Sequence, residues 1–361
     1  LLNHYPNLKN IVKRANSLVI QKLLRVFSRP SKFFKINEPP IASLLWFMSS
    51  DALMHLYGSD SYLYKLNLMH IDKVIGSLME ELDKMGYLDE TAIVITSDHG
   101  NYKGKKGRNL FSLLNKKGLN NYHPRKNPNG NMNLAEFGGV GFFYFKGNSG
   151  FNFNKQSLDW GFPTIKELKS FGPKNVNLLE YLFKIRGTSL LYYRDNNNSA
   201  KQGTIYLKRK SKVSGKIING RIEYKGSGKD LRTKYSIDGD DNDIFGYRNH
   251  ESARKLINKN FHTHQDWIDA TYNFDFPLYP DLLVRHFKNP RSADLIISTQ
   301  GKIVYNITHG KQKEKRYWNH DIGLRESSVV PLIIGGSQDI PKKEIPYSSI
   351  VDIVPTLMDF L

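Results

Sequence analysis

The chain has 361 residues, of which 39% are hydrophobic and 12% are aromatic. A chain of this length and composition can bury a sizeable core, which excludes a disordered protein and predicts one large or two modest domains. Lys and Arg number 53 against 34 Asp and Glu, and the formal net charge is +19. Such a charge favours anionic partners such as phosphate esters, nucleic acid or an anionic membrane surface, but the abundance of Lys and Asn throughout explains it equally well.

The sequence contains no cysteine, which excludes disulfides and thiolate ligands. A bound metal ion would therefore be held by His and carboxylate side chains. No apolar run reaches the roughly 18 to 20 residues that cross a bilayer, so we expect a soluble protein without a transmembrane segment. The chain begins with Leu1 and lacks the pattern of a signal peptide, so targeting information is absent and the compartment stays unknown.

Helical and strand patterns alternate in the first hundred residues. Apolar residues recur at helical spacing over residues 7–29 until Pro30, which predicts a basic amphipathic helix. Residues 41–48 form a short apolar run that predicts a buried parallel strand. An amphipathic helix over 71–85 ends at Gly86, and residues 92–96 predict the next buried strand. This strand–helix–strand unit is typical of α/β folds.

The pattern is less regular after residue 100. Residues 101–133 are rich in Gly, Asn and Lys and predict a long surface loop with a short helix at 110–114. Residues 203–224 alternate apolar and polar side chains and predict small β-hairpins, with Asn219-Gly220 as the strongest turn signal. The other predicted elements are strands at 140–145, 189–193, 294–298 and 329–334 and helices at 178–185, from 279 and from 350.

These patterns predict an α/β fold with a mainly parallel central sheet and helices on both faces. We expect residues 1–100 to form part of the α/β core and residues 101–277 to form an inserted cap region with loops and hairpins. Residues 278–361 would then return to the core and be cut off within the last helix.

Two Asp/His pairs are the candidate functional residues. Asp51 and His55 are four residues apart, which places both side chains on one face of a helix, where they can share an ion. Asp98 and His99 follow a predicted strand, and the carboxyl ends of parallel strands are where open α/β sheets place their active sites. One such pair is weak evidence, but two at matching positions predict a metal site. Zn²⁺ suits these ligands best, followed by Mn²⁺ or Fe.

Two other groups of ligand-type residues are less convincing. Asp238, Asp240, Asp241 and Asp243 resemble a Ca²⁺ loop in composition, but the Glu that ends such a loop is missing, so a solvated loop is favoured. His262, His264 and Asp266 form a local cluster that nothing links to the two pairs. We interpret it as a polar surface segment.

The pairs lie in segments that resemble the alkaline phosphatase superfamily, and the type I phosphodiesterase and nucleotide pyrophosphatase branch fits best. The resemblance rests on Trp46-Phe47-Met48-Ser49-Ser50-Asp51-Ala52-Leu53-Met54-His55 and Thr96-Ser97-Asp98-His99-Gly100. It implies that Asp51 and His55 bind one metal ion and that Asp98 and His99 bind a second.

The resemblance also implies a further His shortly before a Val-Pro-Leu strand. Val330-Pro331-Leu332 is preceded by His320, which we choose to complete the site of Asp51 and His55. The family usually has Gly after this His, whereas Asp321 follows here. His309, which Gly310 follows, is the second choice because it lies farther from the strand.

The family's nucleophile is a Ser or Thr that follows a metal-binding Asp near the N-terminus, yet the first fifty residues contain no Asp. We expect the chain to be a fragment that begins after this segment and has little activity by itself. The alternative is a chain that has lost the catalytic half of the site.

The resemblance implies metal-dependent hydrolysis of a small anionic phosphate ester, either a diester or a monoester. Basic residues available to hold such a substrate are Lys103, Lys105, Lys106 and Arg108. Two alternatives stay open: a sulfatase or phosphoryl head-group transferase of the same fold, and a non-catalytic protein that binds nucleic acid or another polyanion. The sequence makes no prediction of the oligomeric state.

Overall fold

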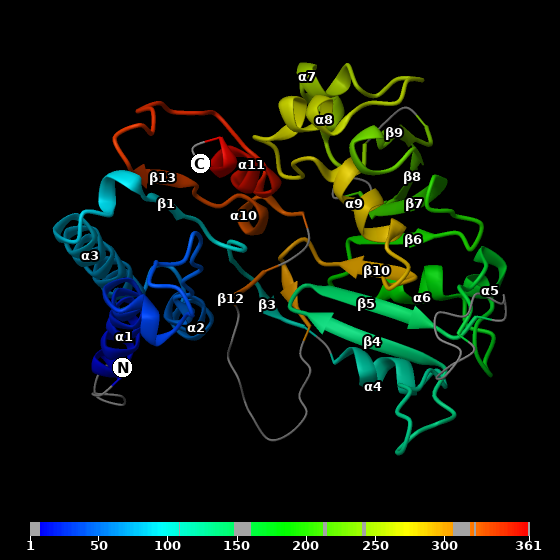
Figure 1. The fold of residues 1–361 in the computed structure, drawn as a ribbon. Helices are drawn as coiled ribbons and strands as arrows, with labels where there is room; N and C mark the ends of the chain where they lie inside the picture. Colours follow the sequence, from blue (N-terminus) through cyan, green and yellow to red (C-terminus); the bar gives the residue numbers. More distant parts are fainter. Residues whose placement is uncertain are drawn as a thin grey trace. The chain divides into compact units, whose positions relative to one another are not determined.

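The computed structural model describes residues 8–107, 109–147, 160–211, 215–239, 243–305, 318–320 and 323–359. The chain divides into two compact units (Figure 1). The first unit comprises residues 1–98 and 330–361, and the second unit comprises residues 99–329. Within the described ranges, no helix is both long enough and apolar enough to cross a membrane.

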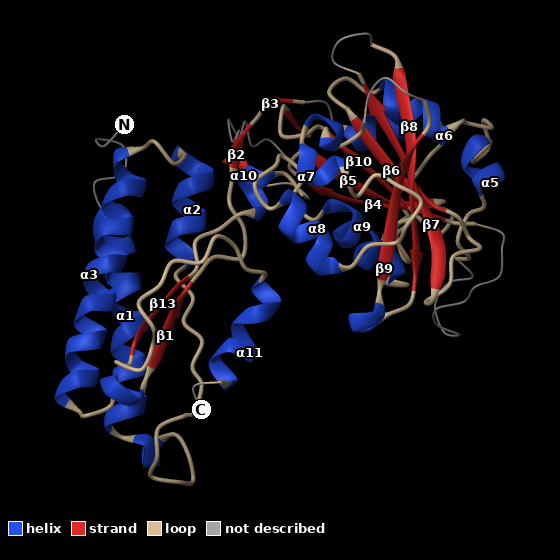
Figure 2. Cartoon of the chain, turned by 90° about the horizontal axis from the view of Figure 1, so that it is seen from above, coloured by secondary structure: helices blue, strands red, loops and turns tan. Residues whose placement is uncertain are grey.

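The N-terminal part of the first unit contains α1 (Leu8–Ser28), α2 (Met48–Tyr57) and α3 (Tyr62–Lys84). Figure 2 shows them side by side. α3 begins nine residues before the predicted start, because Ser61 caps it by accepting a hydrogen bond from the Tyr64 N–H at 3.2 Å. Gly86 follows the helix with a φ of +76°, which only glycine adopts without strain. The shared core of α1 and α3 consists of Ile20, Val74, Leu78 and Leu82.

The strand predicted at 92–96 is confirmed as β1 (Ala92–Ile95), but the strand predicted at 41–48 is wrong. Residues 41–47 form no regular element, and Ile41 and Leu44 are 89% and 96% exposed. Pro39 and Pro40 have no N–H to give to a ladder, and no neighbouring strand pairs with this run. β1 pairs instead with β13 (Ile333–Gly336), and this pairing is antiparallel. The first unit also contains α11 (Ile353–Met358).

The second unit is organised around a seven-stranded sheet with the order β4-β5-β10-β6-β7-β8-β9. Its strands are β4 (Met132–Phe137), β5 (Val140–Phe145), β6 (Leu190–Arg194), β7 (Gln202–Lys210), β8 (Ile217–Lys225), β9 (Arg232–Ile237) and β10 (Leu295–Ser298). Every neighbouring pair in this sheet is antiparallel, so the prediction of a mainly parallel sheet is wrong. β6 and β10 are buried along their whole length, and a strand covered on both faces has the same apolar run in either direction.

Helices cover both faces of this sheet. Leu191 and Tyr193 of β6 join the core under α4 (Leu110–Asn115), α5 (Ile165–Lys169) and α6 (Leu178–Lys184). Tyr192 points to the opposite face, where its ring lies 5.8 Å from that of Tyr279 at the start of α9 (Tyr279–Lys288). The remaining helices of this unit are α7 (Glu251–Arg254), α8 (His264–Thr271) and α10 (Arg325–Ser328).

The predicted small hairpins form one longer hairpin, in which β7 and β8 pair over nine residues each. Asn219-Gly220 lies inside β8 and is not a turn, which corrects the strongest turn signal in the sequence. A side chain at position 220 would meet Ile244 Cδ1 and the Ser236 carbonyl oxygen at 2.9 Å each. Glycine at this position therefore allows Ile244 and the neighbouring strand to pack closely against the interior of β8.

Candidate metal site

α2 carries the first Asp/His pair. The helix includes the whole interval from Asp51 to His55 and ends where Gly58 adopts a φ of +84°. One helical turn brings Asp51 Oδ1 within 3.2 Å of His55 Nε2, as the spacing predicts. The Asp51 side chain is 51% exposed and that of His55 is 23% exposed, so the pair lies at the surface of the first unit.

Asp98 is the last residue of the first unit, three positions after β1 ends at Ile95. Its Oδ1 accepts a hydrogen bond from the Ser97 hydroxyl at 3.4 Å. His99, the next residue, opens the second unit. The Ser-Asp-His-Gly segment therefore spans the boundary between the two units.

 His99 and His320 are 221 positions apart in the chain, yet their rings lie face to face in the second unit. Their ring centroids are 3.8 Å apart and the ring planes differ by 25°. β2 (Tyr102–Lys103) pairs antiparallel with β12 (Trp318–Asn319), so the residue after β12 comes back beside the residues before β2. The His99 ring nitrogen Nδ1 lies 3.1 Å from the Gly100 carbonyl oxygen.

Two residues of this strand pair, Tyr102 and Asn319, hold His320 in place. The Tyr102 hydroxyl accepts a hydrogen bond from the Gly139 N–H at 2.9 Å and donates one to the His320 carbonyl oxygen at 3.5 Å. The Asn319 side-chain oxygen accepts a hydrogen bond from the His320 N–H at 2.9 Å. A Cβ at Gly138 would come within 2.3 Å of the Asn319 side chain, so only glycine leaves room for it there.

The structure thus groups the five predicted ligands as two pairs, Asp51 with His55 and His99 with His320, and places Asp98 next to His99 in the chain. Two ligand atoms at about 2.1 Å from one tetrahedral Zn²⁺ are about 3.4 Å apart. The 3.2 Å between Asp51 and His55 therefore fits two corners of such a site. Among the described residues, no group of three or more His, Asp or Glu side chains could hold a metal ion.

Several other predicted residues lie elsewhere or outside the described ranges. His309, Arg108, Asp240 and Asp241 are outside the described residues. Lys103 lies on β2, with its Nζ 5.7 Å from the Trp318 ring centre, and β3 (Lys105–Lys106) carries the next two lysines. These two strands place Lys103 and Lys105 in the second unit, a few residues after His99.

Asp243 is a structural carboxylate. It is 7% exposed and accepts hydrogen bonds from the Phe245 and Gly246 N–H groups at 2.7 Å each. The Tyr235 hydroxyl donates a third at 3.1 Å. A carboxylate with these partners anchors its own loop, so the solvated loop favoured for this segment does not describe Asp243.

His264 has a buried partner that the sequence did not reveal. Its Nδ1 lies 3.0 Å from Oδ2 of Asp281, which is 1% exposed, and Arg285 also donates to this carboxylate. Burial raises the pKa of Asp281, but hydrogen bonds from His264 and Arg285 outweigh it, and the pKa lies below its usual value. The contact joins α8 to α9, and only their packing brings together residues 17 positions apart.

Comparison with protein families gives one match. Residues 5–158 match the model for Type I phosphodiesterase / nucleotide pyrophosphatase. The matched segment includes Asp51, His55, Asp98 and His99, whereas His320 lies beyond it. No curated protein matches the chain. Residues 5–158, less than half of the chain, therefore resemble the type I phosphodiesterase/nucleotide pyrophosphatase family, which is part of the alkaline phosphatase superfamily.

Proposed function

We propose that this chain hydrolyses phosphate esters, either diesters or monoesters, with the help of two divalent metal ions, Zn²⁺ first. The proposed ligands are Asp51, His55, Asp98, His99 and His320. The family match supports phosphate-ester hydrolysis as the type of reaction. The observation that supports metal binding is that Asp51 and His55 lie on one face of α2, with Asp51 Oδ1 3.2 Å from His55 Nε2. This is the length of an ordinary His–Asp ion pair, and it also suits two ligands of one ion.

The chemistry of such a site divides between the ions and the chain. Bound divalent ions polarise the phosphoryl oxygens and stabilise the charge that develops on the leaving oxygen. The chain would supply the ligands and orient them, and Lys103 and Lys105 would attract the anionic substrate. We expect the attacking hydroxyl to come from a Ser or Thr outside the five ligands.

Metal analysis tests the proposal directly. The purified chain should bind Zn²⁺, and His55→Ala and Asp98→Asn should each weaken that binding at least tenfold. His262→Ala is the matched control, because His262 lies outside the proposed site and should leave the affinity unchanged. Equal Zn²⁺ affinity in the wild type and both ligand variants would overturn the assignment of the ligands.

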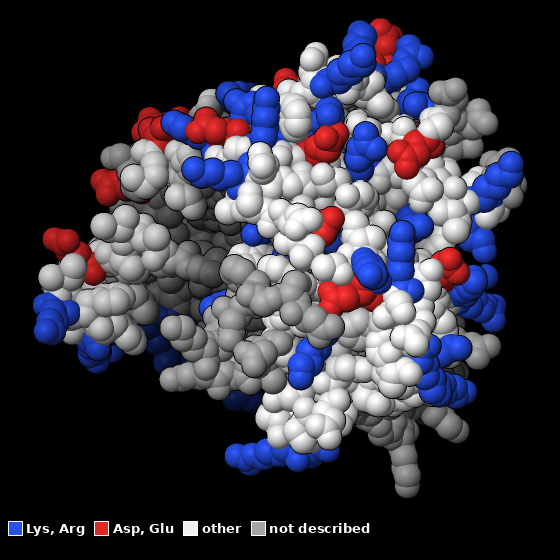
Figure 3. Space-filling view, turned by 90° about the vertical axis from the view of Figure 1, so that its right-hand side faces the viewer, with Lys and Arg blue, Asp and Glu red and all other residues white. Residues whose placement is uncertain are grey.

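Substrate assays separate the alternatives. Hydrolysis of bis(p-nitrophenyl) phosphate or p-nitrophenyl phosphate supports a phosphoesterase, whereas hydrolysis of p-nitrophenyl sulfate alone supports a sulfatase. Salt-sensitive binding of polyanions without metal or turnover supports a binding protein. On the face shown in Figure 3, Lys and Arg are interspersed with Asp and Glu and do not gather into one basic patch, which does not favour that last alternative for this face.

A further inference from the structure

Four polar side chains form a hydrogen-bonded group between the helices of the first unit. Asn16 of α1 and Asn67 of α3 are only 2% and 3% exposed, and the Asn16 amide donates to Asn67 Oδ1 at 2.9 Å. The Ser49 hydroxyl donates to Asn16 Oδ1 at 2.7 Å, and the Asn67 amide donates to Ser50 Oγ at 3.4 Å. We call Asn16, Asn67, Ser49 and Ser50 the Asn–Ser network.

The network anchors the first turn of α2 from outside that helix. Phe47 occupies the N-cap position and provides no side-chain cap. Ser49 and Ser50 lie in the first turn, and the asparagines that bind them come from α1 and α3. Asp51 is the next residue, and His55 follows one turn later. The first turn of α2 is therefore joined to both neighbouring helices immediately before the candidate ligands.

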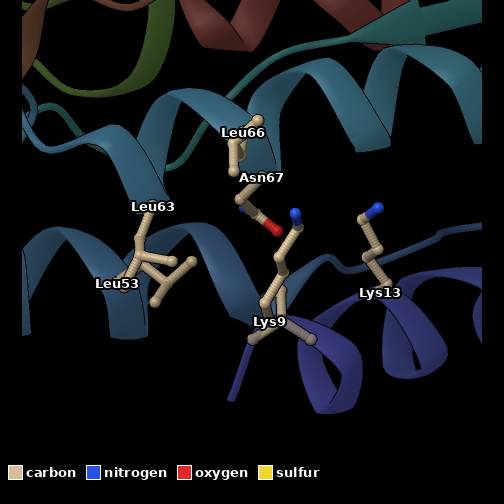
Figure 4. Close-up of a pocket in the computed structure, with 7 residues that line it drawn as sticks. Lys9, Lys13, Leu53, Leu63, Leu66 and Asn67 are labelled. Atoms are coloured by element: carbon tan, nitrogen blue, oxygen red, sulfur yellow. The ribbon is translucent and has the colours of Figure 1, made fainter. Parts of the chain in front are cut away.

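Apolar packing by itself restrains α2 weakly. Leu53 is the one residue of α2 that is fully buried. Figure 4 shows Leu53 beside Leu63 of α3, and shows Asn67 pointing from α3 towards α1. The pocket lined by these residues has a volume of about 10 Å³, which is room for one water molecule at most. A single buried leucine leaves rotation of the helix about its axis poorly defined, and directional hydrogen bonds can define it.

A role in fixing the relative arrangement of the helices explains the Asn–Ser network better than a contribution to the free energy of unfolding does. Burying an amide costs free energy unless its donors and acceptors are satisfied, and replacing both partners by apolar side chains is often neutral or stabilising. A buried polar residue between helices can instead select one register. A rotation of α2 by about 30° would move atoms about 5 Å from its axis by roughly 3 Å. Metal–ligand distances tolerate only about 0.2 Å.

We propose that Asn16 and Asn67 are positioning residues that fix the rotation of α2 and thereby the direction in which Asp51 and His55 point. The role of Asp51 and His55 as metal ligands rests on the proposed function, whereas the role of the Asn–Ser network in fixing the rotation of α2 does not. The two parts can therefore be tested separately.

Spin labels report the position of α2 without any assay of activity. Because the chain has no cysteine, Leu56→Cys on α2 and Glu80→Cys on α3 can each carry one label. We expect a narrow distance distribution with the native network and a broader or shifted one with Asn16→Leu/Asn67→Leu. Asn10→Leu changes an exposed asparagine on α1 and should leave the distribution narrow. An unchanged distribution in the double variant overturns the inference.

A second variant guards against simple misfolding of the first. Ser49→Ala/Ser50→Ala removes the hydroxyls from α2 and leaves the buried asparagines bonded to each other, and we expect a smaller broadening. If the double asparagine variant fails to fold, a narrow distribution in the serine variant overturns the inference, and a broadened one supports it.

Zn²⁺ affinity, measured by competition with a chelator, connects the network to the site. We expect the double asparagine variant to bind Zn²⁺ at least tenfold more weakly while its melting temperature stays close to that of the wild type. Equal affinity would overturn the role in positioning ligands. If the wild type binds no Zn²⁺ but the variant still broadens the distances, the proposed function fails and the role of the network in positioning α2 stands.

Discussion

The two units bury their apolar side chains to very different extents. The core of the second unit extends across the sheet and under α4, α5 and α6, and it includes fully buried rings such as Phe143. The fully buried apolar cluster of the first unit consists of Ile20, Val74, Leu78 and Leu82. Many large apolar side chains of the first unit are exposed instead, including Leu44 at 96% and Trp46 at 66%.

This difference divides the candidate ligands between two environments. Asp51, His55 and Asp98 belong to the first unit, and His99 and His320 belong to the second. Local stability follows the number of buried apolar contacts, so we expect the first unit to open at a lower free energy than the second. A two-stranded ladder such as β1–β13 is marginal by itself and leaves the helices to stabilise this unit.

The largest effect is expected in the core of the second unit. Trp267 is fully buried, and its indole N–H donates to Thr233 Oγ1 at 2.8 Å. Trp267→Ala should lower the free energy of unfolding of this unit by about 3–5 kcal/mol, because it leaves a large cavity. Hydrogen exchange should show faster exchange in the sheet while α1 and α3 keep their rates. Trp46→Ala, at an exposed tryptophan, is the control; an equal loss there would contradict the comparison.

A smaller loss is expected in the first unit. Leu82 of α3 is 2% exposed, and Leu82→Ala should cost about 2–3 kcal/mol, because a small cluster can relax around the cavity. Hydrogen exchange of the backbone amides should become faster in α1 and α3 but not in β5, β6 and β10. Leu68→Ala, on the same helix and 44% exposed, should change exchange little. Faster exchange throughout both units would show that they unfold together.

Glu136 on β4 should make the stability of the second unit depend on pH. Neither of its carboxylate oxygens has a hydrogen-bond partner among the residues that the structure describes, and burial raises its pKa to about 8 from 4.5. The folded state then binds the proton more tightly, so its stability is highest below pH 4.5 and falls as the pH rises towards 8. The slope is at most about 1.4 kcal/mol per pH unit.

Glu136→Gln should remove this slope in urea unfolding measured across the pH range. Glu251→Gln, at the exposed start of α7, is the control and should keep it. The slope is expected between about pH 4.5 and about pH 8. The assignment to Glu136 is contradicted if the stability of the wild type does not change between pH 5 and pH 8, or if Glu136→Gln leaves the slope unaltered.

The smallest effect on stability is expected at Tyr102. Tyr102→Phe removes the hydroxyl that binds Gly139 and His320, at a cost of about 0.5–1.5 kcal/mol. If His320 is a ligand, Zn²⁺ affinity should fall by several-fold, whereas the exposed Tyr62→Phe should change neither quantity. A loss of stability without any loss of affinity would limit Tyr102 to a structural role.

The sequence determined some of the helices and the local part of the site. Helical periodicity located α1 and most of α3, and Gly86 marked the end of α3, because these signals depend on neighbours within a few residues. The spacing of Asp51 and His55 likewise fixed their proximity within one helical turn. The motifs around both Asp/His pairs indicated the family that residues 5–158 match.

Tertiary structure decided what depends on distant partners. Strand direction in the large sheet could not be read from apolar runs, because burial on both faces gives the same run in either direction. Gly220 belongs to a strand because Ile244 and Ser236 approach it closely. His320 lies beside His99 because two-residue strands pair there, and strands so short leave no periodic signal in the sequence.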